Sequence, residues 1–439
     1  MKKMKLNFLN AVIILLFAGI FTSCKKDEQP ATTGKNITEI VNADPNFSLL
    51  KKAVEKAGLG TALASGTLTA FAPDNAAFAA SGINESTINS LSVSQLQLIL
   101  TYHVVEGKFV SGAIQNNGTL RSLSGINIKS TITNEGVFVN KVKVKSADLI
   151  ASNGVIHIIE KVLIPPTITD IVVEDPNFSI LKAAVVKAGL ATALSQGTLT
   201  VFAPDNTAFA ASGIDEALIN SLPVSAIDSI LKYHVVAGKV LASAVPASDT
   251  VNTLLTTNLY ASKKANSVFI NGNIVKTADI LAANGVIHVI SKVLIPPTKT
   301  IAQIVSEDSE LSLLLTAVVR AGLADAVSGE GKFTVFAPTN AAFIAAGFPD
   351  ADAINAAPVD AVASIVKAHL FGTNVFSSDL TAGATVPTLE TGKSLLVGLT
   401  PPSVKIVGSS NPASNIIIPA GVNITATNGV IHKIDRVLQ

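Results

Sequence analysis

The feature that most constrains this chain is a long sequence repeat. Three similar strings recur, TLTAFAPDN at residues 67–75, TLTVFAPDN at 198–206 and KFTVFAPTN at 332–340. Their central phenylalanines are Phe71, Phe202 and Phe336, so the repeat period is 131 residues (202 − 71) and then 134 (336 − 202). Solenoid repeats are much shorter and depend on their neighbours, so each unit here is expected to bury its own core as an autonomous domain.

The composition supports folded domains and excludes some classes of partner. Hydrophobic residues make up 48% of the chain and charged residues only 14%. Lys and Arg total 32 against 31 Asp and Glu. A balance this even argues against nucleic acid or an anionic membrane surface as the partner.

The N-terminus is expected to be a targeting signal. Lys2, Lys3 and Lys5 precede an apolar run over residues 11–21, which is typical of a leader that is removed, and we place it at residues 1–23. Cys24 is the only cysteine and follows the run in Phe-Thr-Ser-Cys, which resembles the lipobox of bacterial lipoproteins with Phe where Leu is usual. Acylation of Cys24 would anchor the protein to a membrane. The alternative is a spare thiol in an ordinary secretory leader.

Residues 24–35 are predicted to be the lipidated cysteine and a flexible polar tether. Lys25, Lys26, Asp27 and Glu28 follow the cysteine and resemble the surface-export signal of lipoproteins in Bacteroidota-type bacteria. We therefore expect a lipid-anchored protein of the cell envelope, on the outer face of the outer membrane, with the periplasm as the alternative. A charge run that is merely solvated is the other interpretation.

Three domains follow the tether, at residues 36–165 (domain 1), 167–296 (domain 2) and 299–439 (domain 3). Paired prolines separate them, in Ile-Pro-Pro-Thr strings at residues 164–167 and 295–298. Consecutive prolines favour an extended, stiff conformation, so the row of domains is expected to be semi-rigid.

The first part of each domain is expected to be helical and the last part to consist of strands. Asp44-Pro45 supplies an N-cap and a first-turn proline, apolar residues follow at helical spacing, and Gly58 offers a C-terminal cap. Later stretches such as residues 137–145 and 154–163 alternate apolar and polar residues, and the Asn153-Gly154 pair is typical of a tight turn. This order predicts an α+β domain.

These motifs are similar to those of a known family. The string TVFAPTNAAF, the Tyr-His pair in LTYHVVEGK and LKYHVVAGK, and the closing NGVIH all resemble the fasciclin domain family, in three copies that cover nearly everything after the tether. The resemblance implies a wedge of two small β-sheets with packed helices. It also implies a role in cell adhesion and matrix contact.

The resemblance also implies candidate contact residues. In fasciclin domains the Tyr-His segment and an Asp-Ile pair before the NGVIH string are implicated in receptor contact. The positions that match here are Tyr102, His103, Asp148 and Leu149 in domain 1, and Tyr233, His234, Asp279 and Ile280 in domain 2. Domain 3 departs from the pattern with Ala368 and Asn423, so we expect domains 1 and 2 to carry the ligand contact.

The histidines are expected to be structural. His157, His288 and His432 close the three NGVIH strings and His369 follows a predicted helix, all within runs of Val and Ile. Such imidazoles are usually buried and held by hydrogen bonds, although a metal site or a general base is an alternative for two histidines and one aspartate. We expect no catalytic residues, no metal and no cofactor.

Signatures of common enzymes are also missing from the sequence. No Gly-x-Ser-x-Gly or His-Glu-x-x-His string occurs, and Gly392-Lys393-Ser394 lacks the glycine of a phosphate-binding loop because Pro387 stands there. The sequence therefore predicts a binding protein whose partner is a protein or a glycan on another cell or in matrix. The alternative is a structural spacer or organiser of the envelope without a dedicated ligand.

Overall fold

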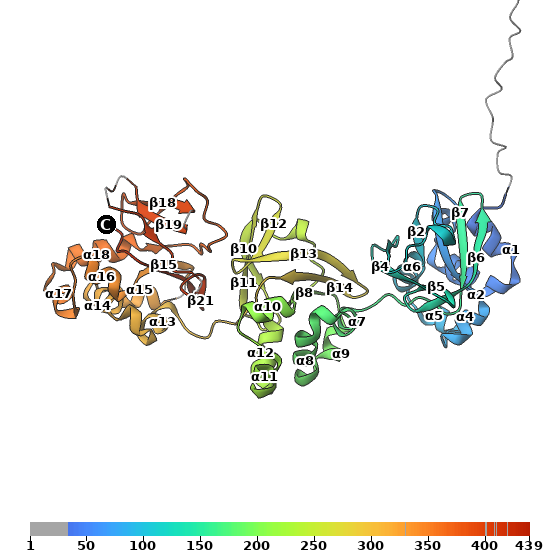
Figure 1. Ribbon diagram of the computed structural model, residues 1–439, viewed down its shortest axis with the longest axis horizontal. Helices are drawn as coiled ribbons and strands as arrows, with labels where there is room; N and C mark the ends of the chain where they lie inside the picture. The colour runs from blue at the N-terminus through green and yellow to red at the C-terminus, as the bar shows by residue number, and fades with distance from the viewer. Residues whose placement is uncertain (1–33, 330, 400–401, 408, 410, 419) are drawn as a thin grey trace, which may run out of the picture.

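A computed structural model describes residues 34–439 except 330, 400–401, 408, 410 and 419. The leader, Cys24 and most of the tether therefore lie outside the described residues. The three domains follow one another in a row, each with a group of helices beside a sheet (Figure 1). In the described part of the chain, no helix is both long and apolar enough to cross a membrane.

Domain 1 begins with helices that are capped as the sequence predicts. They are α1 (Ile37–Ala43), η1 (Pro45–Phe47), α2 (Ser48–Ala57), α3 (Gly60–Leu63), α4 (Asn75–Ala80), α5 (Glu85–Ser90) and α6 (Val93–Tyr102). Asp44 caps η1 with Pro45 in its first turn, and Gly58 ends α2 in the left-handed conformation, φ 69°. Asp74 accepts a hydrogen bond from Ala77 N at the start of α4. These helix ends are therefore set by local sequence.

The sheet of domain 1 has seven strands in the order β2-β1-β7-β6-β5-β4-β3. The strands are β1 (Leu68–Pro73), β2 (Val104–Glu106), β3 (Thr119–Arg121), β4 (Asn127–Thr133), β5 (Gly136–Val139), β6 (Val142–Ala151) and β7 (Gly154–Ile159), with η2 (Ser111–Ala113) between β2 and β3. Strands β1 and β7 are parallel, and the other neighbours are antiparallel. The register of β6 shifts twice, between Val144 and Leu149, so this strand joins the two halves of the wedge.

Two hydrophobic cores share this sheet. One lies between the helices and β1, and includes Phe47, Phe78 and Ile156. The other lies inside the curled half of the sheet, around Phe71 and Ile128. A sheet with apolar residues on both faces has to be covered on both sides, which the helices and the curl of the sheet achieve.

Domain 2 repeats the same order with the same sheet. Its elements are α7 (Ile168–Glu174), η3 (Pro176–Phe178), α8 (Ser179–Ala188), α9 (Ala191–Leu194), β8 (Leu199–Pro204), α10 (Asn206–Ala211), α11 (Glu216–Ser221), α12 (Val224–Tyr233), β9 (Val235–Ala237), η4 (Ala242–Ala244), β10 (Ser248–Asn252), β11 (Asn258–Lys264), β12 (Ser267–Ile270), β13 (Asn273–Ala282) and β14 (Gly285–Ile290).

Domain 3 keeps the helices but divides the strands between two four-stranded sheets, β16-β15-β22-β21 and β17-β18-β19-β20. Its elements are α13 (Ile301–Glu307), η5 (Ser309–Leu311), α14 (Ser312–Arg320), α15 (Ala324–Ser328), β15 (Phe333–Pro338), α16 (Asn340–Ala345), α17 (Ala351–Ala356), α18 (Val359–Ala368), β16 (Leu370–Phe371), β17 (Thr385–Pro387), β18 (Ser394–Leu399), β19 (Pro402–Ile406), β20 (Ser414–Asn415), β21 (Ile424–Ala426) and β22 (Gly429–Ile434). The predicted α+β class is confirmed in all three domains.

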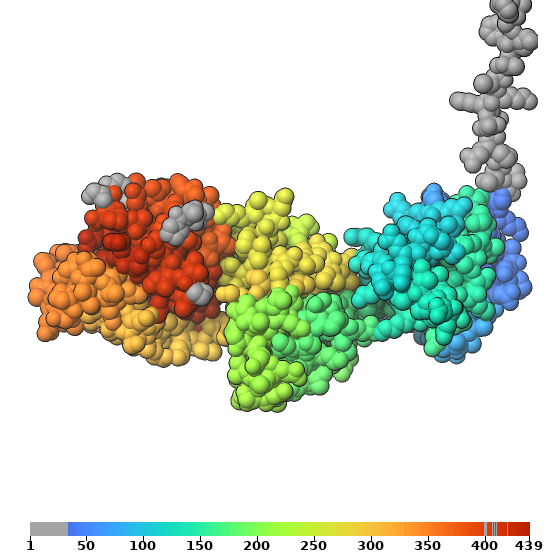
Figure 2. Space-filling view, viewed as in Figure 1, coloured from blue at the N-terminus to red at the C-terminus, as the bar shows by residue number. Residues whose placement is uncertain are grey.

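The domains also contact one another. At the first junction, Leu281 of domain 2 packs against the second core of domain 1, beside Gly125. At the second junction, Tyr260 of domain 2 stacks on Phe376 of domain 3 with ring centroids 5.0 Å apart, and both side chains are buried. Figure 2 shows a narrow contact at the first junction and a broad one at the second. The arrangement of the domains is therefore stabilised by side-chain packing between neighbouring domains as well as by the proline pairs.

Candidate functional site

The histidines of the NGVIH strings are fixed by two hydrogen bonds each. His157 Nδ1 accepts a bond from Asp148 N at 3.3 Å, so its Nε2 carries the proton and donates to Phe109 O at 2.7 Å. The ring also stacks on Phe71, with centroids 5.5 Å apart. His288 and His432 repeat both bonds. These imidazoles join β6 or its counterpart to the loop after β2, which is a structural role.

The histidines of the Tyr-His segment are also engaged at both nitrogens. His103 Nε2 accepts a hydrogen bond from Leu163 N at 2.8 Å, so Nδ1 carries the proton and donates to Ile99 O, also at 2.8 Å. His234 and His369 make the same pair of bonds. Burial lowers the pKa of each of these three imidazoles to about 4. They are therefore neutral, and a metal ion could bind only if a backbone bond were broken first.

Tyr102 and Tyr233 do not lie on the surface. Their rings are fully buried, and each hydroxyl donates to a backbone oxygen, that of Asn127 or Asn258, and accepts from the amide of Asn140 or Asn271. Burial raises the pKa of both hydroxyls to about 12. The suggestion that these tyrosines anchor a partner directly therefore has to be corrected, because the rings belong to the core.

The packing of domain 3 shows why this domain can have an alanine at the position of Tyr102 and Tyr233. Ala368 occupies the place of Tyr102, and Phe371 fills the space by packing edge-on against Phe336, with ring centroids 5.3 Å apart. Val105 stands in domain 1 where Phe371 stands in domain 3. A large and a small residue have thus exchanged places, which keeps the core filled.

Asp148 lies where β6 bulges, in the left-handed conformation with φ 62°. Its carboxylate accepts hydrogen bonds from Ser111 N at 2.7 Å and Ser111 Oγ at 2.5 Å, and these bonds hold the pKa of the carboxyl below its ordinary value. Asp279 likewise accepts a bond from Ala242 N. The aspartate therefore ties the bulge to the loop that follows β2.

Asn423 performs the same task in domain 3. It also has a positive φ, 57°, and its side chain accepts from Ser377 N and donates to Ser377 Oγ. The amide can replace the carboxylate because it supplies both an acceptor and a donor to the same serine. The loss of the charge therefore leaves the local fold intact.

Apolar side chains surround the bulge of domain 1. Leu149, named from the sequence, is exposed, whereas its counterpart Ile280 in domain 2 is half-buried against that domain's core. Two further exposed residues were missed by sequence reasoning, Ile150 next to Leu149 and Val110 next to Ser111. We call Val110, Leu149 and Ile150 the N-terminal patch. An alignment of the three repeats at these positions could have identified the N-terminal patch from the sequence.

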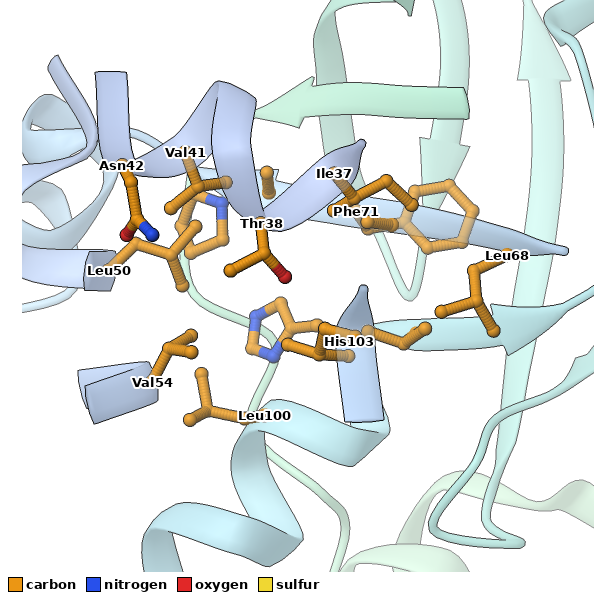
Figure 3. A pocket seen from close by; sticks show the side chains of 15 residues that line it. Ile37, Thr38, Val41, Asn42, Leu50, Val54, Leu68, Phe71, Leu100 and His103 are labelled. Carbon is orange, nitrogen blue, oxygen red and sulfur yellow. The ribbon is translucent and has the colours of Figure 1, made fainter. Parts of the chain in front are cut away.

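A small apolar cavity lies beneath α1, lined by Ile37, Val41, Leu50 and His103 among others (Figure 3). Its volume is about 40 Å³, and domains 2 and 3 have counterparts of about 20 and 40 Å³. Binding sites for small molecules are usually several hundred Å³. These cavities are therefore packing defects between the first helix and the sheet.

A larger cavity of about 390 Å³ lies at the junction of domains 2 and 3. Threonine and asparagine side chains line much of it, among them Thr256, Thr257, Thr425 and Asn374. A second cavity of about 920 Å³ lies on domain 1, and Leu281 of domain 2 contributes to its lining. Among the described residues, no three His, Cys, Asp or Glu side chains gather as they would around a metal ion.

Comparison with known proteins gives the family. The chain is 32% identical to transforming growth factor-beta-induced protein ig-h3 of Oryctolagus cuniculus over 423 residues, which are 94% of this chain and 59% of that protein. It is 25% identical to periostin of Homo sapiens over 92% of this chain and 47% of that protein. It therefore spans about half to three fifths of the length of these relatives. Protein sll1483 of Synechocystis is 44% identical over 142 residues, 31% of this chain and 78% of that protein.

A solved structure of a FAS1 domain pair from the insect cell adhesion molecule fasciclin I matches 59% of this chain and 95% of that chain, with 21% identity and a TM-score of 0.30. The model of the fasciclin domain family matches residues 45–165, 176–296 and 309–439. Since these three segments make up most of the chain, the protein belongs to the fasciclin domain family.

Proposed function

We propose that this protein is a lipid-anchored adhesion protein of a bacterial cell envelope, which holds a protein partner at the cell surface without catalysing a reaction. The leader followed by Cys24 supports the anchor, and membership of the fasciclin domain family supports adhesion. The basic and acidic residues directly after Cys24 favour the outer face of the outer membrane.

The observation that carries the proposal is the N-terminal patch. Ile150 is 55% exposed, Leu149 precedes it in β6 with its side chain towards the other face of the strand, and Val110 precedes Ser111, which Asp148 ties to the bulge. Exposed aliphatic side chains at a bulge whose backbone is fixed by hydrogen bonds suit the apolar part of a protein interface. Sugars are more often bound against aromatic rings, which this patch does not contain. A protein partner therefore fits the patch better than a glycan.

Beads coated with the protein are expected to adhere to bacterial cells, and Leu149→Asp should reduce the number of attached beads at least about tenfold because a charge in the interface centre is costly. Val186→Asp is the control, since Val186 is an exposed aliphatic residue (63%, against 39% for Leu149) on α8 of domain 2, away from the patch. Treating the cells with protease should abolish attachment. If periodate, which destroys glycans, abolishes attachment and protease does not, the protein partner is excluded.

The anchor gives a separate prediction. Cys24→Ser should abolish labelling of the protein by a radioactive or clickable fatty acid and should release it from the membrane fraction, because no other thiol is present. Fractionation and lipid labelling of cells that express the two forms would measure this. A variant that stays lipid-labelled would contradict the anchor.

A second candidate function is a structural organiser of the envelope. The observation in its favour is the second junction, where Tyr260 and Phe376 are buried against each other and Lys264 donates a hydrogen bond to Leu380 O. A row of domains that is fixed in this way keeps a constant length, which suits a spacer.

A further inference from the structure

The cavity at the junction of domains 2 and 3 has the dimensions of a binding site for a small molecule. Its volume, about 390 Å³, lies within the range that is usual for such sites. Strands β10 and β11 of domain 2 lie on one side of the junction and β21 of domain 3 on the other (Figure 1). Asn258 and Thr427 of the lining are exposed, so the cavity opens to solvent. A ligand held there would contact both domains.

The described lining offers hydrogen-bonding groups and carries no net charge. Thr250 and Thr257 of domain 2 and Thr425 of domain 3 are half-buried, and their hydroxyls make no hydrogen bond to the described residues. A hydroxyl can both donate and accept. Lys332 also lines the cavity, but its Nζ lies 4.0 Å from Asp249 Oδ1 across the junction, so its charge is balanced. These groups suit a neutral polar ligand better than an ion.

One buried polar atom of the lining lacks a partner. Asn374 Oδ1 is buried and forms no hydrogen bond within the described part of the chain. Domains 1 and 2 have exposed lysines, Lys108 and Lys239, at the same place in the loop. An unpaired buried acceptor destabilises the free chain, so the asparagine is explained if a molecule in the cavity donates to it. A small rotation of the amide towards the cavity would bring the oxygen to such a donor.

A second residue at the cavity is also unfavourable for stability. Thr256 has a positive φ, 65°, which β-branched residues rarely adopt. Domain 1 has Gly125 at this place in the turn, since Gly125 N donates to Ser122 O as Thr256 N donates to Thr253 O. Strained residues of this kind cluster at functional sites. Two unrelated unfavourable features, one from each domain, thus meet at one cavity.

The stacked rings of Tyr260 and Phe376 give the cavity an apolar border. Saccharides combine hydroxyls with apolar C–H groups, and the C–H groups pack well against aromatic rings. We propose that the junction cavity binds a neutral saccharide unit, with its hydroxyls on the threonines and Asn374 and its C–H groups against the two rings. The cavity is separate from the N-terminal patch, so this inference goes beyond the proposed function and does not depend on it.

Isothermal titration of the chain that begins at Lys25, which keeps all three described domains, tests the proposal. The probes are glucose, galactose, mannose, N-acetylglucosamine and their disaccharides. At least one should bind with a Kd of about 0.1 to 10 mM, as expected for a site with few contacts. Asn374→Leu and Thr425→Val should each weaken binding at least about tenfold. Thr131→Val is the matched control, because Thr131 is exposed on β4 of domain 1, away from the cavity.

The variant Gly272→Lys tests whether both domains form the site. A Cβ at Gly272 would lie 2.5 Å from Asn423 Nδ2 and 3.2 Å from Phe376 Cβ, so a lysine forces domain 3 away from domain 2. Lys141 has the same turn position in domain 1 with a φ of 66°, so the fold of domain 2 tolerates the change. Saccharide binding should be lost while each domain stays folded, which circular dichroism would show.

The melting temperature separates a role in binding from a role in folding. Asn374→Leu should melt no lower than the native chain without saccharide, because it removes an unpaired polar atom, and saccharide should raise the melting temperature of the native chain alone. No binding of any probe at about 50 mM would leave water as the partner of Asn374 and overturn the proposal. Binding that Asn374→Leu and Gly272→Lys leave unchanged would overturn it as well.

Discussion

Gly154→Ala is expected to destabilise domain 1 by about 4 kcal/mol, a large share of the stability of a typical domain. Gly154 pairs with Leu68 where the parallel strands β1 and β7 begin, and a Cβ at this position would lie 1.8 Å from Leu68 O. The three nearest atoms all belong to the backbone of Leu68, so the clash is relieved only if the two strands separate. The backbone φ of 153° adds strain for any residue with a side chain. Thermal unfolding of the variant followed by circular dichroism would measure the loss.

The control is Gly58→Ala. Gly58 also has a positive φ, 69°, but nothing lies within 4 Å of a Cβ placed there. The variant should lose only about 1 kcal/mol, the cost of the left-handed conformation for a residue other than glycine. If the two variants lost the same stability, close packing at Gly154 would not be the cause. Gly285 and Gly429 meet Leu199 O and Phe333 O in the same way, so the prediction extends to the other domains.

The predictions from sequence that held were local ones. The caps at Asp44 and Gly58 depend on residues within one turn, and the structure contains both. The alternation of apolar and polar residues over residues 154–163 predicted a strand, which is β7, ending at Ile159. Local rules of this kind do not say which strands pair, and nothing in the sequence marked β1 and β7 as the parallel pair at the centre of the sheet.

The candidate site could be predicted only in part, because its geometry depends on distant partners. His157 bonds to a carbonyl 48 residues away, and His103 bonds to an amide 60 residues away. Tyr102 ends a helix that has polar residues on its other face, so its sequence position does not reveal that the ring points inward. The bulge at Asp148 likewise depends on its bonds to Ser111.

The packing between the domains could be predicted from the sequence even less than the candidate site. Paired prolines predicted a semi-rigid row, but the contact of Tyr260 with Phe376 needs both folded domains to bring the two rings together. The exposure of Ile150 becomes informative only beside its counterpart Leu281, which packs against the core of domain 1. Whether domain 3 binds an external partner more weakly than the others stays a prediction. Its bulge segment already faces domain 2, which is consistent with that expectation.

Acidification is expected to destabilise domain 3 most. Burial lowers the pKa of His369 and of His432 from 6.5 to about 4, so the unfolded chain takes up two protons that the folded domain does not. The folded pKa is depressed, so the stability is fully present above pH 6.5 and is lost as the pH falls towards 4. Each histidine contributes about 3 kcal/mol to this loss, and the pair about 6 kcal/mol.

The protonation of carboxylates changes the stability of the domains in a lower pH range. The pKa of Asp74 and of Asp205 lies below 3.8, so their effect on the stability of domains 1 and 2 appears only in stronger acid.

Hydrogen exchange followed by mass spectrometry, at pH 7.5 and about pH 4.5 with the exchange times corrected for pH, would report the opening free energy of each domain separately. His432→Gln should be less stable than the native chain at pH 7.5 but should lose about half as much stability on acidification, because only His369 then takes up a proton on unfolding. Equal stability of native domain 3 at the two pH values would mean that these histidines are not held neutral by burial.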